Sequence, residues 1–232
     1  MIDVALAIVV AVVTWTVAAE GAWGAAAVFL SVLLSGLVAM DFFEPLANLL
    51  ESMFPVEWAG RVDFIALVSL FAGGVFGLRT LSERLAPGFI AVNSRVYDVF
   101  RWGFALATGY VTMAFLLTAL HTAPLPREFM GFAPERKNFF GLTAPDREWL
   151  GFVQYVSEKS MRSSEDGRIF DGTSYRFRTQ SNLIWPTFIF RYATRREAAS
   201  GGLDVSSTTA GGSSPNGASV SRPIAPIQPG GM

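Results

Sequence analysis

The stretch from Ile2 to Met40, IDVALAIVVAVVTWTVAAEGAWGAAAVFLSVLLSGLVAM, decides the fold class, because its only ionisable side chains are Asp3 and Glu20. As one helix it would span roughly 58 Å at ~1.5 Å per residue, about twice the apolar core of a bilayer. The chain must therefore turn within it. Glu20-Gly21 is the natural point, because the charge favours the interface and glycine accepts any φ.

Apolar segments of spanning length recur further along the chain, separated by short charged connections. The sequence thus predicts an all-α membrane protein whose first 121 residues form a four-helix transmembrane bundle. The expected spans are residues 3–19, 22–41, 63–81 and 102–120. Residues 41–60 are acidic and amphipathic, which fits either a short surface helix ending before Pro55 or a connecting loop.

Charges return after Pro124, so we expect an extramembrane region over residues 122–197. Within it, Pro145 suits the first turn of a helix, and Thr143 and Asp146 have the spacing of a capping box. The sequence predicts an amphipathic helix over residues 145–159.

Two weaker patterns follow that helix. Residues 169–177 are typical of a β-hairpin across Asp171-Gly172, while Pro186 argues against a continuous helix from 183 to 192. Residues 198–232 are rich in Gly, Ser, Thr, Ala and Pro, and we expect this tail to be disordered.

Composition excludes several classes of activity. The net charge is −1, there is no cysteine, and His121 is the one histidine, so thiol chemistry, a His-rich metal site and a globally basic nucleic-acid binder are not expected. No Gly-x-Ser-x-Gly, His-Glu-x-x-His or phosphate-loop motif is present. We therefore expect no enzyme activity, no cofactor and no nucleic-acid partner.

Ionisable residues are missing from the interiors of all four expected spans, which argues against a proton-driven pump. His121 lies at the end of the last span and is interpreted as an interfacial anchor. Glu20 has two interpretations: an ion pair with Arg79 or Arg101, or a solvated interfacial charge, which we favour. The expected interfacial charges are Asp3, Glu20, Arg95 and Arg101.

Small residues recur at helical spacing within the expected spans. Such residues let helices approach closely in lipid, where the hydrophobic effect between helices is weak. They predict packing inside one bundle, with a homo-oligomer interface as the alternative. The positions are Gly21, Ala25, Ser35, Gly36, Gly73, Gly77, Gly103 and Ala107.

Orientation follows from the Lys and Arg residues near the spans. The two sides tie when the C-terminal region is counted, and the loops break the tie, because long tails cross largely regardless of charge. The basic third connection, with Arg79, Arg84, Arg95 and Arg101, is then cytoplasmic. Both termini are expected to face outward.

Residues 1–120 resemble the colicin V production protein (CvpA) family, which also has four predicted spans. The matching residues are Asp3 before the first helix, Gly21 after it, Gly36 in the second helix, and Arg95 and Gly103 at the last helix. The chain departs from the family at Glu20-Gly21 and Ser94-Arg95, where Arg-Gly and Asp-Arg are usual. The resemblance implies a bacterial inner-membrane protein linked to envelope processes or export.

The expected function is a non-enzymatic accessory or scaffold in the inner membrane. Residues 124–197, which are aromatic and basic in part, would contact protein partners. One alternative is an oligomeric channel or export component assembled through Gly73 and Gly77. Another is a structural subunit of a large membrane complex.

Overall fold

The computed structural model of the chain describes residues 1–54, 59–85, 93–126, 129–132 and 137–159, with the pairs 175–176, 184–185, 188–189 and 192–193. The tail predicted to be disordered, 198–232, lies outside the described residues. So does the Asp171-Gly172 turn of the predicted hairpin. The described strands, β1 (Tyr175–Arg176) and β2 (Ile184–Trp185), pair with each other in antiparallel fashion, which gives β1 a later partner than the sequence predicted.

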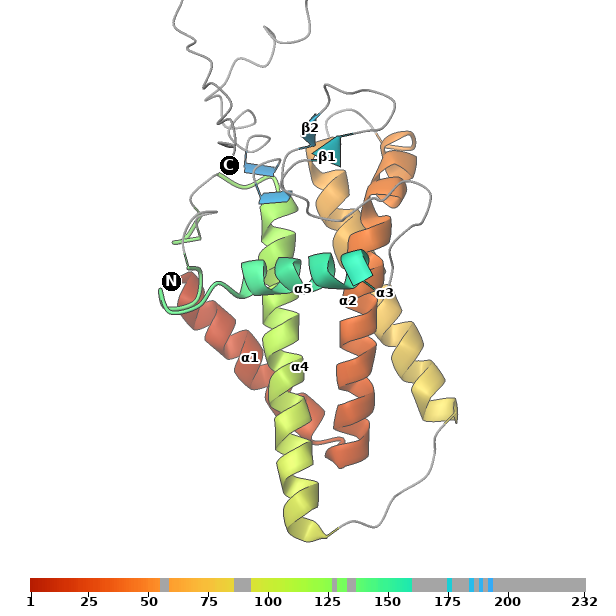
Figure 1. Cartoon of the computed structure of the whole chain (residues 1–232), viewed down its shortest axis with the longest axis vertical. Coiled ribbons are helices and arrows are strands. Elements are labelled where there is room, and N and C mark those ends of the chain that lie inside the picture. The colour runs from red at the N-terminus through yellow and green to blue at the C-terminus, as the bar shows by residue number, and fades with distance from the viewer. Residues whose placement is uncertain are drawn as a thin grey trace, which may run out of the picture.

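Helices dominate the part of the chain that the structure describes (Figure 1). Three of them are long and apolar enough to cross a membrane, so the chain is an all-helical membrane protein. The first helix is also apolar, but its 17 residues rise only about 26 Å. The helices are α1 (Ile2–Ala18), α2 (Gly21–Glu51), α3 (Ala59–Leu85), α4 (Ser94–Thr122) and α5 (Pro145–Lys159).

The helices α2, α3 and α4 extend beyond the spans predicted for them, whereas α5 has the predicted bounds. Each predicted span ends at the first charged residues. The helices continue further, because a turn of charged residues that follows the apolar segment can stay helical. At the end of α3, for example, Arg79 and Glu83 pair one turn apart at 3.1 Å.

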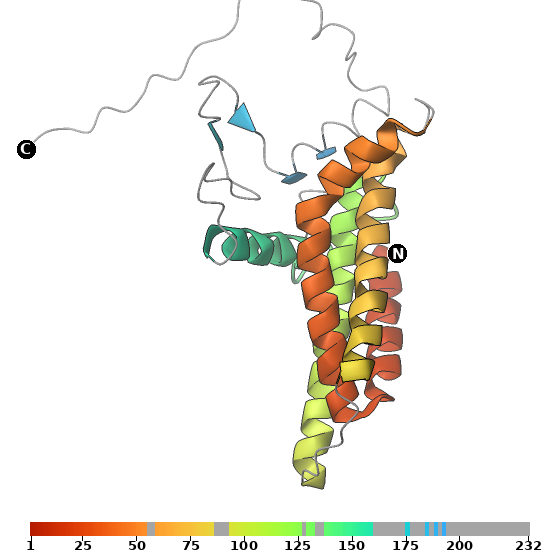
Figure 2. The same cartoon turned by 90° about the vertical axis from the view of Figure 1, so that its right-hand side faces the viewer.

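The largest difference from the sequence prediction concerns residues 41–51. They continue α2 through Pro45, so they form neither a separate surface helix nor a loop. Proline removes a backbone hydrogen bond and bends a helix, and Figure 2 shows the upper part of α2 inclined to the rest. Tertiary packing keeps this part helical, because Ala47 is buried against Val62 and Ala66 of α3.

The bundle is organised around α2 and α4. The helix α2 packs along α3 on one side and α4 on the other, while α1 packs mainly on α4 (Figures 1 and 2). Two glycines allow the close approaches. A Cβ at Gly109 would lie 2.9 Å from the Val10 carbonyl oxygen of α1, and one at Gly74 would lie 2.8 Å from Ser35 Oγ of α2.

The helix α5 lies crosswise to the long helices, over α4 and α2 (Figures 1 and 2). Its residues Trp149, Leu150 and Val153 are buried in the same hydrophobic cluster as residues of α1 to α4. The boundary predicted after residue 121 therefore falls inside one hydrophobic core.

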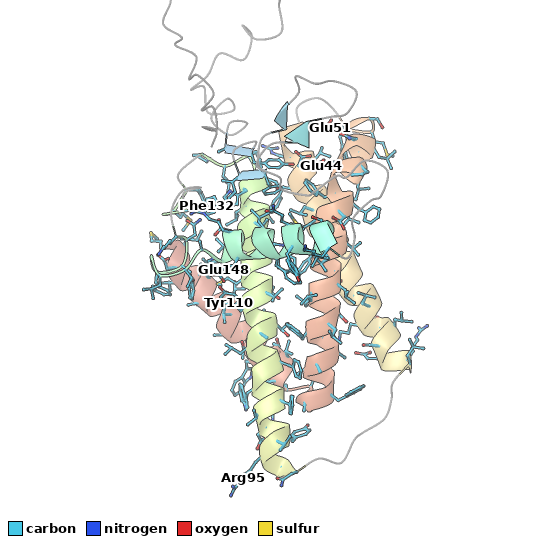
Figure 3. The ribbon with its side chains drawn as sticks, viewed as in Figure 1. Glu44, Glu51, Arg95, Tyr110, Phe132 and Glu148 are labelled. Atoms are coloured by element: carbon cyan, nitrogen blue, oxygen red, sulfur yellow. The ribbon has the colours of Figure 1, made fainter. Side chains whose placement is uncertain are left out.

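The two ends of the bundle differ in charge. Glu44 and Glu51 lie at the end that carries the second connection, and Arg95 lies at the opposite end (Figure 3). Arg95 shares the start of α4 with Arg101, and the end of α3 carries Arg79 and Arg84. Glu44 and Glu51 thus mark one end of the bundle, and the four arginines mark the other, where Glu20, Glu83 and Asp98 accompany them.

Candidate functional site at the junction of α4 and α5

A buried hydrogen-bonding contact joins the last turn of α4 to the first turn of α5. His121 Nε2 lies 2.9 Å from Asp146 Oδ2, and both side chains are completely buried. The N-terminal end of a helix stabilises a negative charge and the C-terminal end a positive one. The acidic Asp146 lies in the first turn of α5 and the basic His121 in the last turn of α4, which are the helix ends that suit each type of side chain.

The surroundings of the pair are largely apolar. The His121 ring meets Phe132 edge-on at 4.9 Å between centroids and Phe188 at 6.5 Å. The Thr118 hydroxyl, bonded to the Ala114 carbonyl at 3.0 Å, lies 3.4 Å from the backbone oxygen of Asp146. Among the described residues, His121 Nδ1 and Asp146 Oδ1 have no hydrogen-bond partner. A buried pair with one satisfied contact depends strongly on keeping both members.

An aromatic contact fixes the next turn of α5. A Cβ at Gly36 of α2 would lie 2.6 Å from Cζ2 of Trp149, so only glycine leaves room for this ring. Trp149 meets Phe115 of α4 edge-on at 6.1 Å, and Phe115 stacks on Phe71 of α3 at 4.0 Å. A line of aromatic rings therefore runs from α5 through α4 to α3.

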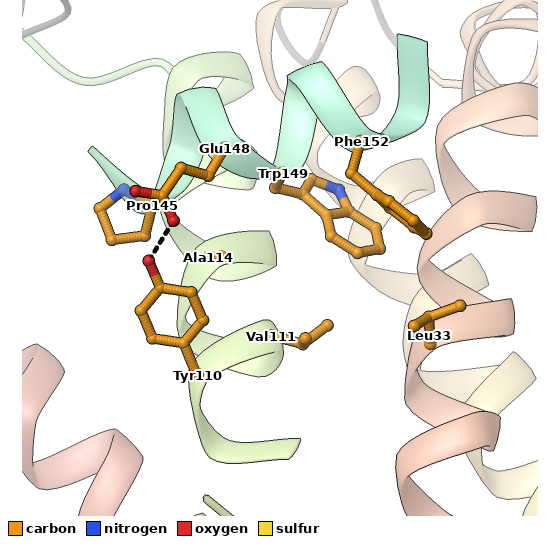
Figure 4. Close-up of a pocket in the computed structure, with 8 residues that line it drawn as sticks. All are labelled: Leu33, Tyr110, Val111, Ala114, Pro145, Glu148, Trp149 and Phe152. Carbon is orange, nitrogen blue, oxygen red and sulfur yellow. Dashed lines mark hydrogen bonds between the residues drawn. The ribbon is translucent and has the colours of Figure 1, made fainter. Parts of the chain in front are cut away.

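A small apolar cavity of about 180 Å³ lies beneath α5, between α4 and α2 (Figure 4). Its lining includes Leu33, Val111 and Phe152. The Tyr110 hydroxyl donates a hydrogen bond to the Glu148 carboxylate at one side of this cavity. It is the third contact between α5 and α4, after the His121–Asp146 and Trp149–Phe115 contacts. These three contacts hold α5 at a fixed angle to the bundle.

The N-terminus is tied to the segment that leads into α5. The backbone N–H of Phe140 donates to Asp3 Oδ1 at 2.7 Å, and the N–H of Ile2 donates to the Met130 carbonyl at 3.1 Å. Asp3, expected only as an interfacial charge, thus connects α1 to the segment before α5.

The other predicted charges lie at the opposite end of the bundle. Glu20 Oε1 pairs with Arg79 Nη2 at 2.6 Å, so the favoured interpretation of Glu20 as a solvated charge is wrong, and Arg79 is its partner among the two candidates. Arg101 Nε instead donates to the Ala18 carbonyl oxygen. Arg95 is exposed at the start of α4. None of these residues lies at the junction of α4 and α5.

The predicted small residues divide into two groups. Gly36 meets Trp149, Gly21 has φ +85° with Tyr97 against it, and Ser35 faces Gly74, while Ala25 is completely buried. The second group has open space around it: a Cβ at Gly73, Gly77 or Gly103 would meet no described atom within 4 Å. Ala107 is half-buried.

Sequence reasoning missed the contact that organises the junction. It interpreted His121 as an interfacial anchor, whereas the side chain is fully buried, and it assigned Asp146 to helix capping, whereas its carboxylate bonds His121. The two residues are 25 positions apart, and no local spacing connects them. A histidine ending one helix and an acid starting the next were the available signal.

Neither a known protein family, nor a curated protein, nor a solved structure matches the chain. The fold alone therefore defines the class: an all-helical membrane protein whose fifth helix is fixed across the bundle.

Proposed function

We propose that this chain is a non-enzymatic accessory or scaffold protein of the bacterial inner membrane, linked to envelope processes or export. All four apolar helices, α1 included, cross the bilayer in this proposal, and both termini face outward. The region that follows α5 contacts protein partners. The likeness to the colicin V production family rests on the residues quoted above and stays a prediction.

The observation that carries the proposal is the fixed position of α5. The His121–Asp146 pair and the Trp149 ring against Gly36 hold this helix to α4 and α2. A helix held in this way gives the chain that follows it a constant starting point relative to the membrane. A scaffold needs such a fixed starting point. The polar side chains of the junction pack the helices together, which agrees with a non-enzymatic role.

In this proposal, the side of α5 that faces away from the bundle is the surface for a partner. Tyr155 is 61% exposed on it. Aromatic side chains of this kind are enriched in protein interfaces because they bury a large area at low entropic cost.

Photocrosslinking in native membranes tests the scaffold proposal. A photoreactive amino acid at Tyr155 should give protein adducts, identifiable by mass spectrometry. The matched control is the same amino acid at Leu106, which is 57% exposed on the side of α4 and should give lipid adducts. Equal protein adducts from both positions, or turnover of a substrate by the pure protein in lipid, would overturn the proposal.

The orientation has its own test. A reporter that is active only in the cytoplasm should stay inactive when it is fused at Gly201. Activity at this position would place the C-terminal region inside and reverse the proposed topology.

A channel or export component is the second candidate, and one observation favours it. The Gly73–Gly77 face of α3 is open in the described structure, which leaves room for a second copy. Ion flux into liposomes separates the candidates: specific flux that Gly73→Leu abolishes supports the channel, and an inert bilayer contradicts it. Co-purification in a fixed stoichiometry with other membrane proteins would support a subunit of a large complex.

A further inference from the structure

A groove separates the lower halves of α2 and α3, at the end of the bundle away from α5. Figure 1 shows the end of α3 diverging from α2, and a cavity of about 330 Å³ lies between the two helices. Its large lining residues are Trp23, Leu30 and Leu34 of α2 with Leu78, Leu81 and Leu85 of α3. Their spacing places each set on one helix face.

The groove presents an apolar surface. Where α2 borders it, the side chains of Ala26 and Ala27 are small, which leaves the space open. The two serines that line the groove use their hydroxyls within their own helices. Ser31 donates to the Ala27 carbonyl at 2.8 Å, and Ser82 donates to the Arg79 carbonyl at 2.8 Å. The groove is about twice the size of the ~150 Å³ apolar cavity that holds benzene in another protein.

An arginine lies in the last turn of α3, beside the end of the groove in sequence. Arg84 is exposed and adjacent in sequence to the lining residue Leu85. Arg79 is engaged by Glu20 and Glu83, whereas Arg84 forms no ion pair within the described residues. The last turn of α3 therefore combines Leu85, which lines the apolar groove, with an exposed arginine that has no ion pair among the described residues.

We propose that this groove binds one acyl chain of an anionic glycerophospholipid, whose phosphate pairs with Arg84. Basic pockets between membrane helices bind anionic headgroups, and a guanidinium matches phosphate geometry. The proposal requires α2 and α3 to lie in a membrane, and it does not depend on the scaffold function.

Native mass spectrometry of the full-length protein tests the proposal. The protein is released from vesicles of equal parts phosphatidylglycerol and phosphatidylcholine, and the lipids that stay bound are counted. Wild type should retain phosphatidylglycerol preferentially. Arg84→Gln should lower the affinity for phosphatidylglycerol roughly fivefold, as expected for one lost charge, without changing retention of phosphatidylcholine.

A second variant tests the groove itself. Ala27→Trp fills the space and should lower retention of both lipids, whereas the matched control Ala72→Trp, on the exposed side of α3, should leave both unchanged. Equal retention of the two lipids by wild type, or no effect of Arg84→Gln, would overturn the proposal. So would an Ala27→Trp variant that dissociates a dimer and keeps its lipid, because the groove would then belong to a second copy.

Discussion

His121 Nε2 and Asp146 Oδ2 lie 2.9 Å apart in a completely buried contact that joins the end of α4 to the start of α5. The contact lies between Phe132 and the aromatic cluster of the core, so water cannot replace either partner without opening the structure. The orientation of α5 therefore depends on a contact between two residues that the sequence separates by a long connection.

Removing one member of this pair should destabilise the protein strongly. His121→Leu and Asp146→Leu each leave a buried polar group without its partner, which costs about 3–5 kcal/mol in comparable sites. The unfolding free energy of each variant in mixed detergent micelles measures this loss.

The double variant is the control for the pair. With both residues replaced by leucine, no unpaired polar group remains, so the loss should be several kcal/mol smaller than the sum of the two single losses. Additive losses would show that the two side chains act independently and would contradict the role assigned to their contact.

Gly36→Ala should loosen α5, because the new Cβ would lie 2.6 Å from the Trp149 ring. We expect a loss of about 1–3 kcal/mol from overpacking and faster amide exchange along α5. Gly103→Ala is the matched control, since its Cβ meets no described atom, and it should change stability by under about 1 kcal/mol. If α5 exchanges at the same rate in both variants, the packing of Trp149 does not hold it.

Local patterns predicted α5 well and the long apolar helices only in their central parts. Pro145 predicts the start of α5, and the apolar spacing of Trp149 and Val153 predicts its buried face. The structure confirms both, because proline fixes the backbone of the first turn and the two apolar side chains are buried. The extension of α2 through Pro45 was beyond such reasoning. It depends on packing against α3, which no pattern within residues 41–51 records.

The junction of α4 and α5 was less predictable for the same physical reason. Trp149 was expected on the apolar face of its helix, but its partner Gly36 lies on a different helix. Gly36 was selected as a small residue for helix packing, and its neighbour proved to be a crossing aromatic ring. Contacts between distant segments set the site, and a single sequence does not record them.

Gly109→Ala should separate α1 from α4. The added Cβ would lie 2.9 Å from the Val10 carbonyl oxygen and 2.7 Å from Thr14 Oγ1, and the backbone atom cannot move alone. We expect a loss of at least about 1–3 kcal/mol in the unfolding free energy. Gly151→Ala, with open space on α5, serves as the control, and equal stability of the two variants would contradict a tight contact between α1 and α4.

The Glu20–Arg79 pair should contribute little despite its short distance of 2.6 Å. The two side chains are 26% and 46% exposed, and exposed ion pairs contribute under about 1 kcal/mol. Glu20→Gln should therefore lower the unfolding free energy by less than this amount, and the difference should shrink in high salt. A larger loss that salt does not reduce would indicate a desolvated pair inside the bundle.

Cysteine labelling should show that α1 crosses the bilayer. The chain contains no cysteine, so a single introduced thiol is the only target of an impermeant maleimide. A cysteine inserted between Met1 and Ile2 should react in intact spheroplasts, whereas Arg84→Cys should react only after the membrane is opened, because α1 to α3 are three consecutive spans. Although α1 rises only about 26 Å, a short helix can span when the bilayer thins locally. Labelling of both positions from the same side would mean that α1 returns to the surface where it began, which would leave three spans.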